Sequence, residues 1–221
     1  MVKINYRPEI DGLRGISVLL VILYHCNIVF FERNYFSGGY LGVDIFFVIS
    51  GYLITDQIVH EIREKKSFNL FSFLIRRVRR IFPILLFVII FCIPFAVYLF
   101  YPVALVEFSN SLISVLSFLS NIFFHYSEIQ YGAEDEQFVP FIHTWSLSLE
   151  WQFYIAFAVF LFLFKSHLDF AKTIVFLIFL LSLAISHYGA LFHPQFSFYF
   201  MPTRIWEFFL GSLLVLNRKK L

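Results

Sequence analysis

The sequence predicts an all-α membrane protein, a polytopic bundle of transmembrane helices, on the basis of three observations. Of its 221 residues, 60% are hydrophobic and 14% are charged, whereas a soluble domain has roughly 45–50% apolar and about 25% charged residues. Apolar runs recur that approach the ~20 residues a helix needs to cross a bilayer. Lys and Arg collect in short segments between these runs, as in cytoplasmic loops. We therefore expect one transmembrane domain over residues 1–221, with about six full spans, one re-entrant or interfacial helix and no soluble domain.

The first expected span covers residues 12–31 and follows Lys3 and Arg7. It is too long for a signal peptide and lacks a small-residue cleavage site. The basic residues before it place the N-terminus in the cytoplasm. A second span is expected over residues 40–59. The basic stretch that follows predicts a cytoplasmic loop, formed by Arg63, Lys65, Lys66, Arg76, Arg77, Arg79 and Arg80.

The third expected span, residues 81–101, has Pro83 in its first turn, where a missing backbone donor costs least, and Pro94 at an expected kink. Three further spans are expected over residues 145–164, 174–188 and 204–216, and the last of them ends at the basic residues 218–220.

The segment 103–124 differs from these spans because polar side chains line one face of it. If it crossed the membrane, the acidic loop 134–136 would be cytoplasmic and the basic terminus would lie outside, against the positive-inside tendency. We therefore predict a re-entrant or interfacial helix. Its polar residues are Glu107, Ser109, Asn110, Ser111, Ser114, Ser117, Ser120 and Asn121.

Arg14 and His25 are the first candidate functional pair. Ten residues separate them, which returns them to nearly the same helix face about 16 Å apart. An ionisable group inside a span costs at least about 2.5–3.5 kcal/mol, so His25 is a functional candidate; the alternative is a neutral imidazole bonded to a helix carbonyl. Asp44, near the outer end of the second span, could orient an imidazole or neutralise an arginine.

Two other groups of charges have both a structural and a functional interpretation. The guanidinium groups of residues 76–80 suit a phosphate-bearing ligand, or they only anchor the topology. Arg204 and Glu207, at positions i and i+3, form a structural ion pair or part of a site. Cys26 and Cys92 lack the spacing of a zinc site, so no metal is expected. A net charge of +2 gives no reason to expect nucleic acid.

Residues 143–154 place His143 and Glu150 beside two indoles at the expected start of a helix. Interfacial anchoring explains Trp and Tyr at such a place, but it does not explain the two titratable groups. This segment is therefore a further candidate site, with Trp145 and Ser146 in it.

Together these motifs resemble the membrane-bound acyltransferase 3 family, whose members O-acylate cell-surface glycans. The Arg-x10-His signature falls on Arg14 and His25, and the Gly-Val-Asp-x-Phe-Phe-Val-x-Ser-Gly block falls on residues 42–51. The Arg-x-x-Arg motif matches Arg77 and Arg80, the His-Thr-Trp-Ser-Leu-x-x-Glu block matches residues 143–150, and Pro-x-Arg-x-Trp-Glu matches residues 202–207. Many relatives have an acidic residue where this chain has Trp151, so no role is carried to that position. The family's membrane domain has more spans, so this chain is expected to lack the last helices.

The resemblance implies an acyltransferase of the bacterial inner (plasma) membrane, in contact with membrane lipids. The donor substrate would be acyl-CoA, expected to be acetyl-CoA, with its phosphates near Arg77 and Arg80 and no tightly bound cofactor. The acceptor would be a glycan or lipid-linked saccharide, such as O-antigen or exopolysaccharide. His25 would be the general base, and Arg14 would pair with the donor or hold its helix. The remaining catalytic and acceptor-entrance roles would fall on Asp44, Glu150, His143, Trp145 and Ser146.

Two rival functions stay open on sequence grounds. A transporter or flippase also uses buried charges and kinked helices, although no internal repeat is present. A non-catalytic accessory subunit of glycan modification would keep the fold without turnover.

Overall fold

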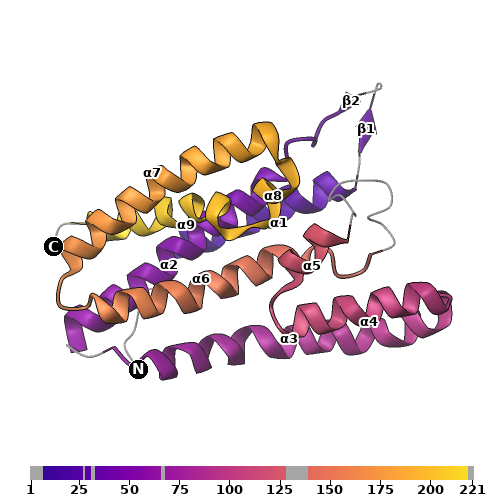
Figure 1. Ribbon diagram of the computed structural model, residues 1–221, viewed down its shortest axis with the longest axis horizontal. Coiled ribbons are helices and arrows are strands. Elements are labelled where there is room, and N and C mark those ends of the chain that lie inside the picture. Colours follow the sequence, from indigo (N-terminus) through magenta and orange to yellow (C-terminus); the bar gives the residue numbers. More distant parts are fainter. Residues whose placement is uncertain (1–6, 27, 31–32, 66–67, 128–138, 219–221) are drawn as a thin grey trace. The chain divides into compact units, whose positions relative to one another are not determined.

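The computed structural model describes residues 7–26, 28–30, 33–65, 68–127 and 139–218. Lys3, Lys66, the acidic residues 134–136 and the last two lysines lie outside the described residues. The all-α prediction is confirmed, with one short hairpin added (Figure 1). The elements are α1 (Pro8–His25), β1 (Val29–Phe30), β2 (Arg33–Asn34), α2 (Leu41–Lys65), α3 (Leu70–Leu99), α4 (Pro102–Leu116), α5 (Ser120–Tyr126), α6 (Thr144–Leu163), α7 (Leu168–Phe192), α8 (Pro194–Tyr199) and α9 (Met201–Leu216).

Contacts divide the chain into two compact units. Unit 1 comprises Met1–Phe68, Leu163–Ser186 and Pro202–Leu221, and so holds α1, α2, α9 and most of α7. Unit 2 comprises Asn69–Phe162 and His187–Met201, and holds α3, α4, α5, α6 and α8.

Among the described helices, α2, α3, α6 and α7 are long and apolar enough to cross a membrane. Helix α1 has 18 residues but carries Glu9, Asp11 and Arg14 in its first half. Helix α9 has 16 residues, about 24 Å of helix against a hydrocarbon core of ≈ 30 Å. The number of spans therefore stays a prediction.

Two helix boundaries differ from the expected ones. Helix α1 ends at His25, six residues before the predicted end at residue 31, and the β1–β2 hairpin follows it. Helix α3 begins at Leu70 because the Asn69 side chain accepts a hydrogen bond of 2.9 Å from the Ser72 amide and caps it. The arginines of residues 76–80 are therefore helical, and the prediction that they lie in a loop is wrong. Pro83 consequently lies in the interior of α3 and not in its first turn.

The polar segment 103–124 is broken into two helices. Helix α4 has 15 residues, about 22 Å, and the chain turns at Phe118, whose φ is 55°, before α5 begins. Serines along α4 donate to carbonyls of their own helix, for example Ser109 to Leu105 at 2.7 Å. The break and the short length agree with a helix that does not cross the membrane.

In unit 1, glycines bring α2 against α1 and α9. A Cβ on Gly51 would collide with the carbonyl oxygen of Phe208, and a Cβ on Gly211 would collide with that of Val48. Small residues at a helix crossing let the backbones approach this closely. Nearby, Thr55 Oγ1 donates to Ser212 Oγ at 2.8 Å. The crossing of α2 and α9 is thus closely packed and hydrogen-bonded. The α1–α2 crossing is similar, because Gly42 lies against the Ser17 carbonyl.

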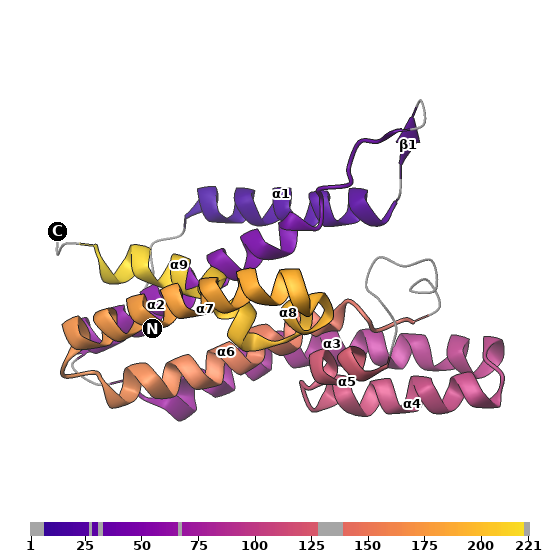
Figure 2. The ribbon, with the colours of Figure 1, turned by 45° about the horizontal axis from the view of Figure 1, so that its top comes forward.

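In unit 2, α4 runs beside the second half of α3, and α5 and α8 lie near the N-terminal end of α6 (Figure 2). A row of polar side chains joins α6 to α5, and we call it the polar seam. Its bonds include Ser148 Oγ to Ser120 Oγ at 2.7 Å, Thr144 Oγ1 to Ser120 Oγ at 3.0 Å, and Gln152 Nε2 to Asn121 Oδ1 at 2.8 Å. The Asn121 amide in turn donates to the Tyr199 carbonyl at 3.0 Å, which ties in α8.

Candidate functional site

His25 is the last residue of α1 and its side chain is exposed. Its Nδ1 atom lies 2.8 Å from the Val21 carbonyl oxygen. A carbonyl oxygen can only accept, so Nδ1 carries the proton, and in the neutral imidazole the basic lone pair belongs to Nε2. The Tyr24 ring packs edge-on against the imidazole at 5.1 Å. The neutral imidazole is therefore the tautomer protonated at Nδ1. It lies at the end of α1 and not, as predicted, inside a longer helix.

Arg14 lies three turns before His25 on the same helix. Its Nη1 atom is 4.0 Å from Asp11 Oδ1, and a quarter of its side chain is exposed. An i, i+3 pair of this kind orients the guanidinium along the helix surface. The two members of the Arg-x10-His signature thus remain separate groups on one helix.

Asp44 and Arg204 form an ion pair between α2 and α9. The Nη1 atom of Arg204 lies 3.0 Å from Asp44 Oδ1 and 2.8 Å from Glu207 Oε1. Of the two roles expected for Asp44, the structure shows the neutralisation of an arginine. Arg204 and Glu207, expected as a structural ion pair or part of a site, do pair with each other, and Arg204 also pairs with Asp44.

Glu207 is completely buried, with a relative exposure of 0%. Its Oε2 atom has no hydrogen-bond partner within the part of the chain that the structure describes. An apolar surrounding disfavours a carboxylate unless a counter-charge compensates it, and Arg204 supplies that charge. The three groups therefore form a partly buried network, with Glu207 as its buried member, that joins α2 to α9 beside the glycine crossing.

In unit 2, Arg77 lies close to the candidate acid Glu150. The guanidinium carbon of Arg77 lies 5.3 Å from the Phe73 ring centroid and 5.6 Å from that of Tyr154. The Tyr154 hydroxyl donates a hydrogen bond to Glu150 Oε1. A chain of contacts thus runs from Arg77 through Tyr154 to Glu150.

This contact corrects the predicted separation of the two groups. Arg77 was expected at a cytoplasmic mouth and Glu150 at the opposite face. Because α3 begins at Leu70, Arg77 lies about 10 Å into that helix. Glu150 lies about 9 Å from the N-terminal end of its own helix, α6. The two half-buried groups are therefore linked through Tyr154 within unit 2, whereas Arg80 is exposed.

The residues expected at an acceptor entrance have different surroundings. Trp145 is 1% exposed and packs against Phe198 and Tyr199, with ring centroids 4.3 and 5.8 Å away. A buried indole does not line an entrance, so this expectation for Trp145 is wrong. His143 is exposed, and Ser146 is half-buried and donates to the His143 carbonyl at 3.1 Å.

The polar seam includes residues that the sequence analysis did not single out. Thr144, Ser148 and Gln152 follow one another at intervals of four, which places them on one face of α6. That spacing, opposite the polar face of the preceding segment, was the signal that could have found them. In the described residues, no three His, Cys, Asp or Glu side chains gather in a metal-binding cluster.

Comparison with known proteins decides the family. Residues 7–221, nearly the whole chain, match the profile of the family described as Acyltransferase domain, the acyltransferase 3 group. The chain belongs to this acyltransferase family. The resemblance drawn from the Arg-x10-His and Gly-Val-Asp motifs is thereby confirmed.

Among its relatives, O-acetyltransferase OatA of Staphylococcus aureus (strain NCTC 8325 / PS 47) is 37% identical over 155 residues, which cover 69% of this chain and 24% of that protein. A protein of Staphylococcus aureus (strain MSSA476), provisionally named an O-acetyltransferase, is 38% identical over 159 residues, or 72% of this chain and 25% of that protein. The chain thus aligns with about a quarter of the length of these curated relatives. No solved structure matches it significantly.

Proposed function

We propose that the protein is a membrane O-acyltransferase that moves an acyl group, expected to be acetyl, from acyl-CoA to a hydroxyl of an extracytoplasmic glycan. The observation that carries the proposal is the geometry of His25, in a chain that belongs to an acyltransferase family. An exposed imidazole whose Nδ1 proton bonds to a carbonyl presents Nε2 as the base. The names of the relatives support transfer to an oxygen atom.

In the proposed reaction, Nε2 of His25 removes the proton of the acceptor hydroxyl as its oxygen attacks the thioester carbonyl. The C–S bond then breaks as the new ester forms, and coenzyme A leaves as the thiol after taking up the proton that His25 received, which regenerates the neutral imidazole. General-base catalysis of this kind contributes typically 10²–10⁴-fold to the rate. The hydrogen bond to Val21 supports the role, because it holds the ring in the tautomer that the step requires.

The donor is proposed to bind through its phosphates to Arg80 and Arg77. Arg80 is exposed and can reach a soluble anion, whereas Arg77 is half-buried against Phe73 and Tyr154. Guanidinium groups bind phosphate bidentately. Glu150 would then act through Tyr154 to position Arg77, and not as a base itself.

The test is mass spectrometry of surface polysaccharide from cells that express the protein, compared with His25→Ala. We expect an increment of one acetyl group that is lost in His25→Ala. His187→Ala is the matched control, because this histidine is also exposed near a helix end. Acetylation that persists in His25→Ala would contradict the assignment of His25 as the base. If the glycan is not acetylated even with the wild-type protein, and His25→Ala impairs glycan export, a transporter would be favoured.

A further inference from the structure

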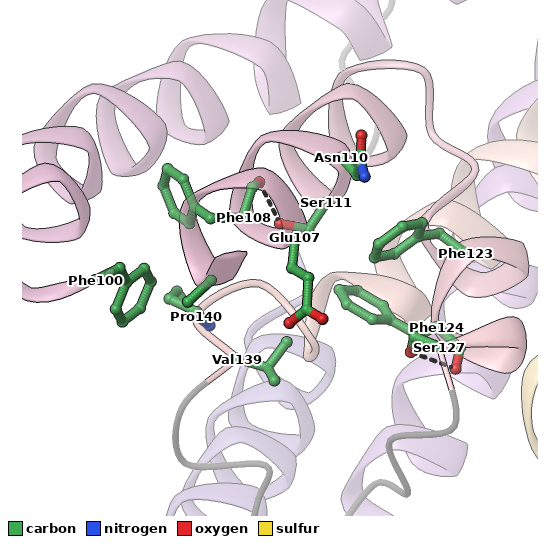
Figure 3. A pocket seen from close by; sticks show the side chains of 11 residues that line it. Phe100, Glu107, Phe108, Asn110, Ser111, Phe123, Phe124, Ser127, Val139 and Pro140 are labelled. Carbon is green, nitrogen blue, oxygen red and sulfur yellow. Dashed lines mark hydrogen bonds between the residues drawn. The ribbon is translucent and has the colours of Figure 1, made fainter. Parts of the chain in front are cut away.

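A pocket of unit 2 is lined by residues other than the proposed base and arginines. It has a volume of about 250 Å³, just below the ~300–1,000 Å³ typical of small-molecule sites. Figure 3 shows it between α4, α5 and the segment that enters α6, with the Glu107 side chain extending toward Val139. Its size suits one sugar ring and is too small for coenzyme A.

Aromatic rings form one part of the pocket wall and are held in place by their neighbours. Phe108 is 6% exposed and packs against Phe100 and Phe141, with ring centroids 6.0 and 5.4 Å away. Phe124 is 1% exposed, and Phe123 packs edge-on against it at 5.3 Å. Rings fixed in this way present a preformed apolar surface, which can receive the C–H face of a pyranose.

The polar part of the wall consists mainly of acceptors. The Ser111 hydroxyl donates to the Phe108 carbonyl at 2.7 Å, and the Ser127 hydroxyl donates to the Phe124 carbonyl at 3.0 Å (Figure 3). Both serine hydroxyls thus already donate their proton to a nearby backbone carbonyl, so they can only accept hydrogen bonds from a ligand. Glu107 adds a carboxylate, which only accepts, and Asn110 adds an amide.

Glu107 is also the only charged residue among the described residues that line the pocket. An acceptor-rich wall with a negative charge favours ligands that carry several donors, such as the hydroxyl or amino groups of a sugar. It disfavours phosphates and carboxylates, because nothing in the described lining compensates their charge. The pocket chemistry is therefore opposite to that of the arginines proposed for the donor.

We propose that this pocket binds a neutral or amino sugar residue of the acceptor glycan, with Glu107 accepting hydrogen bonds from its hydroxyl or amino groups. The inference rests on the proposed function for the identity of the ligand. It assigns acceptor recognition to α4 and α5, where the sequence analysis had placed it at the start of α6.

The experiment is saturation-transfer NMR on the purified chain in a detergent without a sugar headgroup. The probes are methyl glucoside, methyl glucosaminide and methyl glucuronide, which share a ring and differ in charge. We expect the first two to bind and the glucuronide to bind at least about tenfold more weakly, because its carboxylate faces that of Glu107. In Glu107→Gln the affinity for the glucuronide should rise to nearly that for the glucoside. In Glu107→Ala the affinity for the glucoside should fall about tenfold.

Glu64→Gln is the matched control, since it removes an exposed carboxylate from the end of α2. Failure of wild type to bind any sugar, equal binding of all three probes, or equal glucoside binding by Glu107→Ala and the control would overturn the proposal. So would binding of glycerophosphoethanolamine in place of the sugars, which indicates a lipid headgroup site. If sugar binding depends on Glu107 but His25→Ala still acetylates, the pocket stands and the proposed base falls. If sugar binding does not depend on Glu107 but His25→Ala abolishes acetylation, the pocket proposal falls and the proposed base stands.

Discussion

The Nη1 atom of Arg204 lies 3.0 Å from Oδ1 of Asp44, although the two residues are 160 positions apart in the chain. The same nitrogen bonds to the buried Glu207. This contact joins α2 to α9 through their polar residues. Gly51 and Gly211 let the backbones of the same two helices approach closely. The two family motifs that contain these residues are therefore one structural feature.

We predict that Arg204→Met destabilises the protein by about 3–5 kcal/mol, because it leaves the buried Glu207 carboxylate without its counter-charge. The double variant Arg204→Met/Glu207→Gln should recover part of this loss. Thermal unfolding in detergent measures both. Arg79→Met, at an exposed position of α3, is the control and should unfold like wild type. A double variant no more stable than the single one would contradict the buried-charge explanation.

Gly51→Ala should destabilise the crossing of α2 and α9 by about 1–3 kcal/mol. The added methyl would meet the carbonyl oxygen of Phe208, which is backbone and can move only with its helix. The matched control is Gly15→Ala, where nothing lies within 4 Å of the added carbon. In a helix interior this control should stabilise by about 0.5–1 kcal/mol. Unfolding temperatures that shift in the same direction for both variants would show that the close approach does not matter.

The polar seam should be sensitive at Asn121, which is 1% exposed. Asn121→Ala removes the amide that joins Gln152 to the Tyr199 carbonyl. Leaving these groups unpaired costs about 1–3 kcal/mol, which chemical or thermal unfolding would register. Ser109→Ala should change stability by less than about 0.5 kcal/mol, since its exposed hydroxyl bonds only to its own helix.

Arg77 and Arg80 should differ in what their replacement changes. Arg80→Ala should weaken coenzyme A binding a few-fold without changing stability, and the effect should fade at high salt. Arg77→Ala should also lower stability, by about 0.5–2 kcal/mol, because it loses the contacts with Phe73 and Tyr154. Calorimetric titration with coenzyme A and a thermal melt separate the two effects. Arg63→Ala is the charge-matched control, and equal weakening by all three substitutions would show nonspecific attraction only.

Much of the helix content could be predicted because hydropathy and charge act locally. The expected run 145–164 differs from α6 by one residue at each end. The predicted helix boundaries were wrong where a short-range signal outweighed hydropathy. The Asn69 cap starts α3 well before its apolar part, and the hairpin after His25 ends α1 inside an apolar run.

The candidate residues were identifiable because a charged or titratable group in an apolar run is costly and therefore conspicuous. Their partners were not identifiable in the same way. Trp145 was expected at an entrance, but its indole is in the core beside Phe198. An indole suits an interface and a core equally well, and only its neighbours distinguish the two.

By itself, the sequence determined that this chain is a helical membrane protein of an acyltransferase family, and it marked Arg14, His25, Arg77 and Arg80 as candidate site residues. The tertiary structure decided that Asp44 pairs with Arg204 and that Arg77 lies close to Glu150 through Tyr154. The physical reason is that helix formation depends on neighbours within a few residues. Which helix faces meet depends instead on close packing and charge compensation between residues distant in the chain, and a linear pattern does not contain that information.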